Sequence, residues 1–195
     1  MRLLRQKELL EYRKELLDVK MMRWNDLPDF GVYSDQVLSI IEEQLSFLQV
    51  TEVDRVITPT MINNYVKLKL IERPVKKKYD KQHIAKLIVI SMLKQVLPLT
   101  DVHKGIQLQV SLKGTEVAYN SFCDEIEQSF KQLFGDLGKE DFSFTIDHIN
   151  QDNLALKMVT LSLASKLLTQ KIIMLNGIHE QNQLPKIEGE NTYEK

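Results

Sequence analysis

Apolar residues recur at helical spacing along most of the chain, which predicts a mainly α protein. The first such pattern covers residues 2–22 and describes an amphipathic helix. Its leucines at seven-residue spacing are Leu3, Leu10 and Leu17. This helix could pack on its own domain or form an intermolecular coiled coil. A second helix, of about 14 residues, is predicted to begin at Ser34 or Asp35.

A short helix with one polar face is predicted over residues 59–68. Thr58 is a typical N-cap residue, and Pro59 is tolerated in the first turn because its missing amide hydrogen would have no helical partner there. Apolar side chains recur on one side of this helix, namely Met61, Ile62, Tyr65 and Val66. The opposite side carries only hydrogen-bonding or cationic groups, namely Thr60, Asn63, Asn64 and Lys67.

A lysine-rich hairpin and a buried helix are predicted next. Pro74 ends any helical structure, and residues 75–79 are expected to form the returning strand of a small β wing. This strand would carry three consecutive lysines, Lys76, Lys77 and Lys78. Asp80 then caps a helix over residues 81–97 that is apolar on most sides, so it should lie at the centre of the fold.

Three more helices are predicted after Pro98, over residues 101–112, 116–134 and 151–176. Thr100 and Asp101 are the expected caps of the first of them. The last helix is apolar on more than one face, which is more than one small core requires. Part of it is therefore predicted to contact a second copy of the chain.

The distribution of charge singles out one stretch as an interface. The whole chain has a formal net charge of −1, but Thr58–Gln95 contains nine basic and two acidic residues, a net charge of +7. Lysines attract phosphates without reading sequence, whereas asparagine pairs with the N6 and N7 atoms of adenine in the DNA major groove. The polar helix face and the lysine run together predict binding of double-stranded DNA. The predicted contact residues are Thr60, Asn63, Asn64, Lys67, Lys76, Lys77 and Lys78.

Several segments also carry a resemblance to known families. The segments are WNDLPDFGVYSDQV, TPTMINNYVK and KKKYDKQHIAKLIVISMLKQVLPL. Together they resemble the bacterial family called domain of unknown function 1836, over about residues 24–105. The order of elements is also similar to the winged helix-turn-helix of MerR-type regulators, through Tyr65, Leu70, Ile71, Tyr79 and the Leu99–Val102 segment. Two positions depart from the MerR pattern, since Asn63 replaces an arginine and Lys69 replaces a glycine.

The MerR resemblance implies a DNA-binding transcriptional regulator. Helix 59–68 would enter the major groove, and the wing at 75–79 would contact the backbone. Two half-sites are usually needed for specific affinity, so a homodimer is expected, joined by the 151–176 helix. Helices 116–134 and 151–176 could also enclose a pocket for a small effector of unknown identity. The alternative is a helical protein-interaction module that keeps the fold and uses the same lysines to bind an acidic protein.

These expectations divide the chain into four parts. Residues 1–23 form an N-terminal amphipathic helix, and residues 24–112 form the winged helix-turn-helix domain. Residues 113–178 form a helical dimerisation or effector region. Residues 179–195 turn polar and acidic, which is typical of a disordered tail.

The sequence gives little support for catalysis or for a cofactor. The histidines His83, His103, His148 and His179 lie on separate elements without the spacing of a metal site. No G-x-G-x-x-G, Walker A or G-x-S-x-G sequence occurs. The single cysteine, Cys123, excludes an internal disulfide and is expected to be a core thiol. Lysines interrupt the longest apolar segment, so no membrane span is predicted. We therefore expect a cytoplasmic protein without catalytic activity, metal or cofactor.

Overall fold

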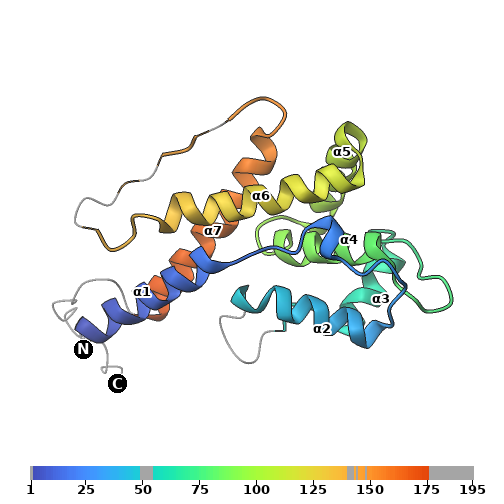
Figure 1. Cartoon of the computed structure of the whole chain (residues 1–195), viewed down its shortest axis with the longest axis horizontal. Coiled ribbons are helices and arrows are strands. Elements are labelled where there is room, and N and C mark those ends of the chain that lie inside the picture. Colours follow the sequence, from blue (N-terminus) through green and yellow to red (C-terminus); the bar gives the residue numbers. More distant parts are fainter. Residues whose placement is uncertain (1, 49–54, 140–142, 144, 148, 176–195) are drawn as a thin grey trace, which may run out of the picture.

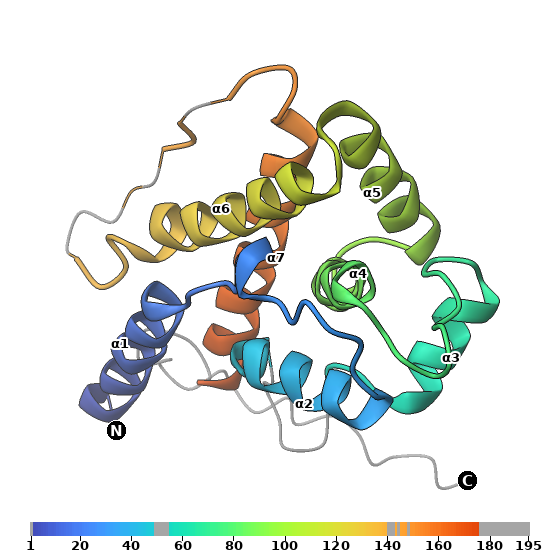
Figure 2. The same ribbon diagram turned by 45° about the vertical axis from the view of Figure 1, so that its right-hand side comes forward.

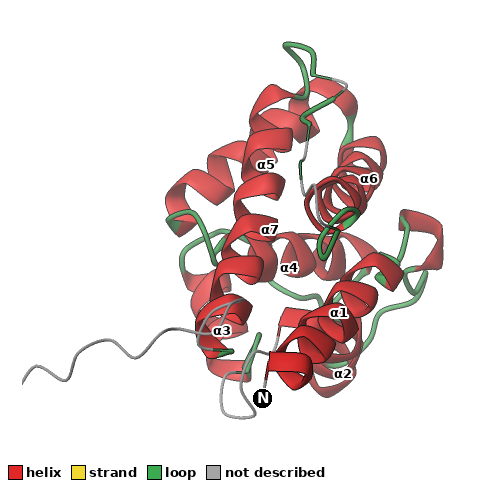
Figure 3. Cartoon of the chain, turned by 90° about the vertical axis from the view of Figure 1, so that its left-hand side faces the viewer, coloured by secondary structure: helices red, strands yellow, loops and turns green. Residues whose placement is uncertain are grey.

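The computed structural model of the protein describes residues 2–48, 55–139, 143, 145–147 and 149–175, without the side chains of residues 2–5. These residues form seven α-helices and two short 3-10 helices, η1 (Trp24–Asp26) and η2 (Ser46–Leu48). The α-helices are α1 (Arg2–Asp18), α2 (Ser34–Gln44), α3 (Pro59–Lys67), α4 (Lys81–Leu93), α5 (Leu99–Lys113), α6 (Thr115–Phe134) and α7 (Leu154–Met174) (Figure 1). The described part of the chain contains helices and loops but no β-strand (Figure 3). The predicted mainly α fold is confirmed.

Helix α4 lies at the centre of the molecule, as predicted. It packs against α2, α5, α6 and α7, and Figure 2 shows it end-on with other helices around it. Ile84, Leu87 and Ile88 on this helix have no exposed surface. The helix ends at Leu93 rather than at residue 97, and residues 94–96 form a turn. Pro98 cannot donate to the carbonyl oxygen of Lys94, and its ring would clash with that carbonyl in a continued helix. The chain before it instead forms a tighter turn, in which the amides of Gln95 and Val96 donate to the carbonyl oxygens three residues earlier.

Helices α6 and α7 form the largest helix–helix contact and use much of the apolar surface of α7 within the chain. Two polar pairs lie in this interface. The Ser129 hydroxyl donates to Thr160 Oγ1 at 2.8 Å, and Lys157 Nζ lies 2.7 Å from Glu125 Oε2. The large apolar residues of α7 that remain exposed are Leu154, Met158, Ile173 and Met174. The predicted start at residue 151 was wrong because residues 151–153 form a turn, which Asn150 Oδ1 holds by accepting from the amides of residues 152 and 153.

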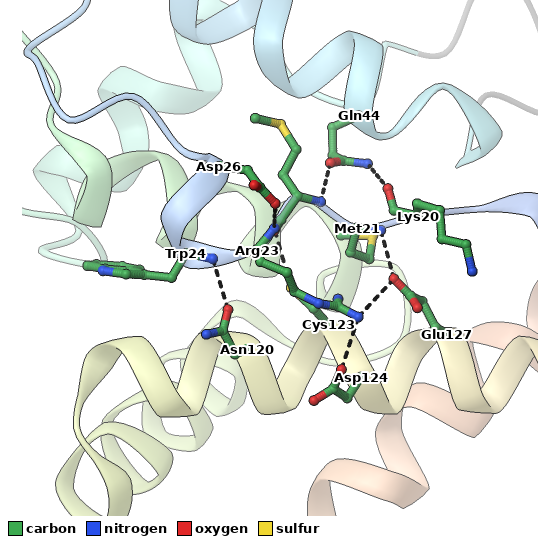
Figure 4. A network of polar contacts seen from close by, with 11 residues as sticks. Lys20, Met21, Arg23, Trp24, Asp26, Gln44, Asn120, Cys123, Asp124 and Glu127 are labelled. Atoms are coloured by element: carbon green, nitrogen blue, oxygen red, sulfur yellow. Dashed lines mark hydrogen bonds and ion pairs between the residues drawn. The ribbon is translucent and has the colours of Figure 1, made fainter.

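Helix α1 packs against α6 of its own chain and buries Leu9 and Leu16. It ends at Asp18 instead of residue 22, because polar side chains from other elements bind the backbone that follows (Figure 4). The amides of Met21, Met22 and Trp24 donate to side-chain oxygens of Glu127, Gln44 and Asn120 at 2.9, 2.6 and 2.8 Å, respectively. The connector between α1 and η1, residues 19–23, is therefore fixed in an extended form on α2 and α6.

Cys123 of α6 lies beneath this connector and is fully buried, so the predicted core thiol is confirmed. Burial raises the pKa of its thiol to about 11. One continuous hydrophobic cluster extends from Leu9 to Leu167. The predicted tail at 179–195 lies outside the described residues. No helix in the described ranges is long and apolar enough to cross a membrane.

The predicted strand of the wing was wrong. The described residues contain only two isolated antiparallel bridges in this region, Val75 with Lys78 and Val32 with Tyr79. Pro74 cannot donate a backbone hydrogen bond, so the hairpin cannot continue past Val75 on that side. The result is a tight turn rather than a strand pair. The predicted 14-residue helix after Tyr33 is also shorter, since it is divided into α2 and η2.

Candidate nucleic-acid interface

Helix α3 presents the polar face that its sequence predicts. Thr58 Oγ1 accepts a hydrogen bond from the amide of Met61 at 3.2 Å, and Pro59 is the first helical residue. Ile62 and Tyr65 are buried. The exposed side chains on the other side are Thr60, Asn63, Asn64 and Lys67. The sidedness of the helix is thus confirmed, although the helix ends at Lys67 rather than at residue 68.

The two ends of α3 are fixed in different ways, the first by a contact with a residue distant in sequence and the second by a left-handed backbone conformation. Before the helix, Lys94 Nζ from the end of α4 donates to the carbonyl oxygen of Val56 at 2.7 Å and lies 3.3 Å from Met61 Sδ. Burial lowers the pKa of Lys94. After the helix, Lys69 has a φ of 56°, and the amide of Leu70 donates to the carbonyl oxygen of Tyr65 at 2.9 Å. The chain therefore reverses within two residues and re-enters the core.

The next element is the lysine turn, which we define as Val75–Lys78. The amide of Lys78 donates to the carbonyl oxygen of Val75 at 2.9 Å. The two central residues, Lys76 and Lys77, have φ values of 50° and 63°. Positive φ at both central positions is typical of a type I′ turn, where asparagine and glycine are preferred. Each lysine in this left-handed region costs about 1–2 kcal/mol.

The lysine turn is held by a bridge to the segment before α2. Val32 and Tyr79 exchange both backbone hydrogen bonds, at 2.9 and 2.8 Å. Lys78 crosses this segment, and its Nζ lies 5.4 Å from the centre of the Tyr33 ring. A Cβ atom added to Gly31 would lie 2.9 Å from Lys78 Cβ. The absence of a side chain at Gly31 therefore allows Lys78 to approach.

Buried His83 of α4 holds both ends of the loop that carries the lysine turn. Its Nε2 lies 3.2 Å from the carbonyl oxygen of Glu72, and its Nδ1 lies 2.7 Å from Asp80 Oδ1. Asp80 also caps α4, as predicted, by accepting from the His83 amide at 3.1 Å. The ring of Tyr79 packs edge-on against the His83 imidazole, with 5.5 Å between the ring centres. The backbone of the loop is thereby fixed at both of its ends.

The acidic residues near the lysine turn are already occupied by other partners. Glu72 binds Lys86 at 2.5 Å, and Asp29 pairs with Lys81. Although its partial burial acts in the opposite direction, the hydrogen bond from Lys86 lowers the pKa of Glu72. In contrast, the lysines of the predicted interface form no ion pair with any described residue, namely Lys67, Lys76, Lys77 and Lys78. Their charge is available to an external anion.

The loop that carries the lysine turn leaves the end of α3, and the two lie at the same end of the molecule (Figure 1). Among the described residues, no hydrogen bond or ion pair joins the polar face of α3 to the lysine turn. The helix and the turn are each fixed by their own contacts with the core. The sequence did not identify three of the supporting residues, Gly31, Tyr33 and Lys94. Gly31 is recognisable as a turn residue, but nothing in its spacing indicates that Lys78 packs above it.

The described residues contain no group of three or more histidine, cysteine, aspartate or glutamate side chains that could hold a metal ion. No curated protein and no solved structure matches the chain. A family profile described as "Domain of unknown function (DUF1836)" matches residues 22–126. This range contains α2 to α5, the lysine turn and the first part of α6. Because the match covers more than half of the sequence, the chain belongs to the DUF1836 family.

Proposed function

We propose that the protein is a DNA-binding transcriptional regulator with a MerR-like winged helix-turn-helix arrangement. In this proposal α3 enters the major groove and the lysine turn contacts the phosphate backbone. The supporting observation is that α3 exposes Thr60, Asn63, Asn64 and Lys67 on the side opposite its buried residues. Beside it lies a turn whose lysines pair with no acidic residue of the described chain. Lys76 and Lys77 of this turn have strained, left-handed backbones. Such residues persist where the surrounding structure fixes them, and they are common at functional sites.

Asn63 and Asn64 are the proposed base-reading residues. Both are exposed on α3, and an asparagine amide can form two hydrogen bonds with one adenine. Thr60 and Lys67 lie at the two ends of the same face and would contact bases or phosphates nearby. The left-handed backbone at Lys69 is consistent with the MerR resemblance, because glycine is the residue that usually adopts this conformation.

The lysine turn takes the role of the wing in this proposal. Its charges neutralise phosphates and set the register of α3 without reading sequence. A single module of this size contacts few base pairs, so a homodimer on two half-sites is part of the proposal. The exposed apolar residues of α7, including Ile173 and Met174, are the proposed dimer contact.

Selection of bound fragments from a random DNA library with the full chain tests the proposal. Enrichment of a palindrome that contains adenines is expected. Asn63→Ala and Asn64→Ala should each cost about 1–3 kcal/mol on the selected site and relax the preference at one position. Lys77→Ala should weaken all DNA sequences alike, whereas the matched control Lys131→Ala, which removes an exposed lysine of α6, should have little effect.

The alternative function is a protein-interaction module in which the same lysines bind an acidic protein. The two functions differ in their response to DNA and salt. DNA binding should fall steeply with salt, with a logarithmic slope of about −0.9 for each phosphate contacted. Weak, sequence-independent binding of DNA fragments at about 50 mM salt would reject the regulator and favour the interaction module.

A further inference from the structure

A half-enclosed apolar cavity lies between α4, α5, α6 and the start of α7. Its volume is about 240 Å³. The apolar side chains on its walls include Val89, Leu93, Val102, Ala118, Phe122 and Val159. All four helices contribute, so the cavity is a product of the tertiary fold and lies apart from the α3 face and the lysine turn.

Gly105, inside α5, lines this cavity and is also exposed to solvent, which places it at the mouth. A glycine in the interior of a helix costs about 1 kcal/mol relative to alanine. Close packing usually explains such a glycine, but a Cβ atom added to Gly105 would meet nothing within 4 Å. No other part of the protein therefore requires a glycine at this position. The absence of a side chain at Gly105 instead leaves the entrance of the cavity wider.

Gln109 lines the same cavity one helical turn after Gly105. Residues four positions apart lie on the same helix face, so the two line one wall. Gln109 Oε1 is buried and has no hydrogen-bond partner among the described residues. An unsatisfied buried acceptor costs about 1–3 kcal/mol. A ligand that donates one hydrogen bond to this oxygen would remove that cost.

We propose that the cavity binds a neutral, mainly apolar small molecule with one N–H or O–H donor directed at Gln109 Oε1. The apolar body of the ligand covers Gly105 and fills the space between α4 and α6. A charged ligand is disfavoured because the walls are largely apolar and would desolvate its charge. Two charged residues also line the cavity. Lys86 is already bound to Glu72 at 2.5 Å, and Asp101 is exposed to solvent.

The test uses the full ¹⁵N-labelled chain and two matched probes, indole and indene. The two molecules have nearly the same shape, but only indole has an N–H donor. Indole is expected to shift the amide resonances of residues that line the cavity, with a Kd of about 0.1–1 mM. Indene should bind the same residues about five- to tenfold more weakly, since it leaves Gln109 Oε1 unsatisfied.

Three variants separate the roles of the two residues. Gly105→Leu fills the entrance and should abolish the indole shifts. Gln107→Leu adds the same side chain to an exposed position of α5 outside the cavity and should leave indole affinity unchanged. Gln109→Leu should remove the preference for indole over indene while apolar binding persists, so this readout remains informative if Gly105→Leu fails to fold.

Three results would overturn the proposal. The first is that neither probe shifts the cavity residues at about 5 mM, well above the expected Kd. The second is that Gly105→Leu binds indole as the natural chain does. The third is that the cavity residues shift when the ligand-free protein is diluted, because a second copy of the chain would then occupy the cavity. None of these results depends on DNA binding, so this proposal and the proposed function can fail separately.

Discussion

Two of the loops that contain positive φ angles meet that requirement with different residues. Between α5 and α6, Gly114 has φ 78° and ψ 163°, a region that is essentially restricted to glycine. In the lysine turn, Lys76 and Lys77 have φ values of 50° and 63°. The first loop has the residue that its backbone favours, whereas the second has two that its backbone disfavours. Ease of folding does not explain the lysines, whereas the proposed contact with an external anion would.

The largest expected effect comes from Gly114→Ala. A side chain in this backbone region should reduce the free energy of unfolding by about 2–3 kcal/mol, as measured by urea denaturation. Gly105→Ala is the matched control, because that glycine lies within α5, and it should gain about 1 kcal/mol. Equal stability of Gly114→Ala and the natural chain would mean that this loop does not need glycine, and the contrast between the two loops would disappear.

Gly31→Ala tests whether the lysine turn depends on its support. The new Cβ atom would lie 2.9 Å from Lys78 Cβ, so the turn must shift. We expect a loss of about 1–2 kcal/mol in unfolding free energy and faster hydrogen exchange at the Tyr79 amide. Because no charge changes, weaker DNA binding by this variant would be due to the position of the turn alone. Unchanged exchange at Tyr79 would show that Lys78 can move without disturbing the bridge.

Replacing the lysine turn by a favoured sequence separates strain from charge. The double variant Lys76→Asn, Lys77→Gly should gain about 1–2 kcal/mol in unfolding free energy, since Asn-Gly suits a type I′ turn. It should also lower the logarithmic salt slope of DNA binding by about 1.8, for two lost phosphate contacts. The control Lys76→Ala, Lys77→Ala loses the same charges but keeps the strain, so it should lose DNA binding without gaining stability. A stability gain in both variants would attribute the cost to charge repulsion instead.

The smallest expected effect is the loss of stability when the Cys123 thiol ionises at high pH. It limits the pH range in which the stabilities of these variants can be compared. Burial raises the pKa of the Cys123 thiol in the folded chain to about 11, so the neutral thiol stabilises the fold at low pH. This contribution is complete below the unfolded pKa of about 8.5–9 and decreases as pH rises towards the folded pKa. Urea denaturation should show a loss of about 1 kcal/mol between pH 8 and pH 10. Cys123→Val should show a smaller loss over that interval, and an equal loss would assign the effect to other groups.

The elements that the sequence predicted well are those determined by neighbouring residues. Thr58 and Asp80 cap α3 and α4 through hydrogen bonds to amides three positions away, and helical spacing places Ile62 in the core. Such contacts are readable because both partners lie within one or two helical turns. The polar face of α3 follows from the same periodicity.

The elements that were mispredicted depend on partners far along the chain. Helix α1 ends early because Glu127 of α6 binds the amide of Met21. Tyr79, at the end of the predicted wing, pairs with Val32, which lies beyond two intervening helices. The cavity at Gly105 likewise depends on four helices meeting. No local sequence pattern specifies these long-range contacts. The sequence therefore indicated which residues are polar and exposed, but not which distant residues fix their positions.

The bridge between Val32 and Tyr79 also has a consequence for the order of folding. It closes a loop that contains both α2 and α3, and the entropy lost in closing such a loop is recovered only when those helices pack. We therefore expect the lysine turn to form late in folding and to open early in unfolding. A newly made chain would then acquire its strained, charged turn only after the core around α4 is complete.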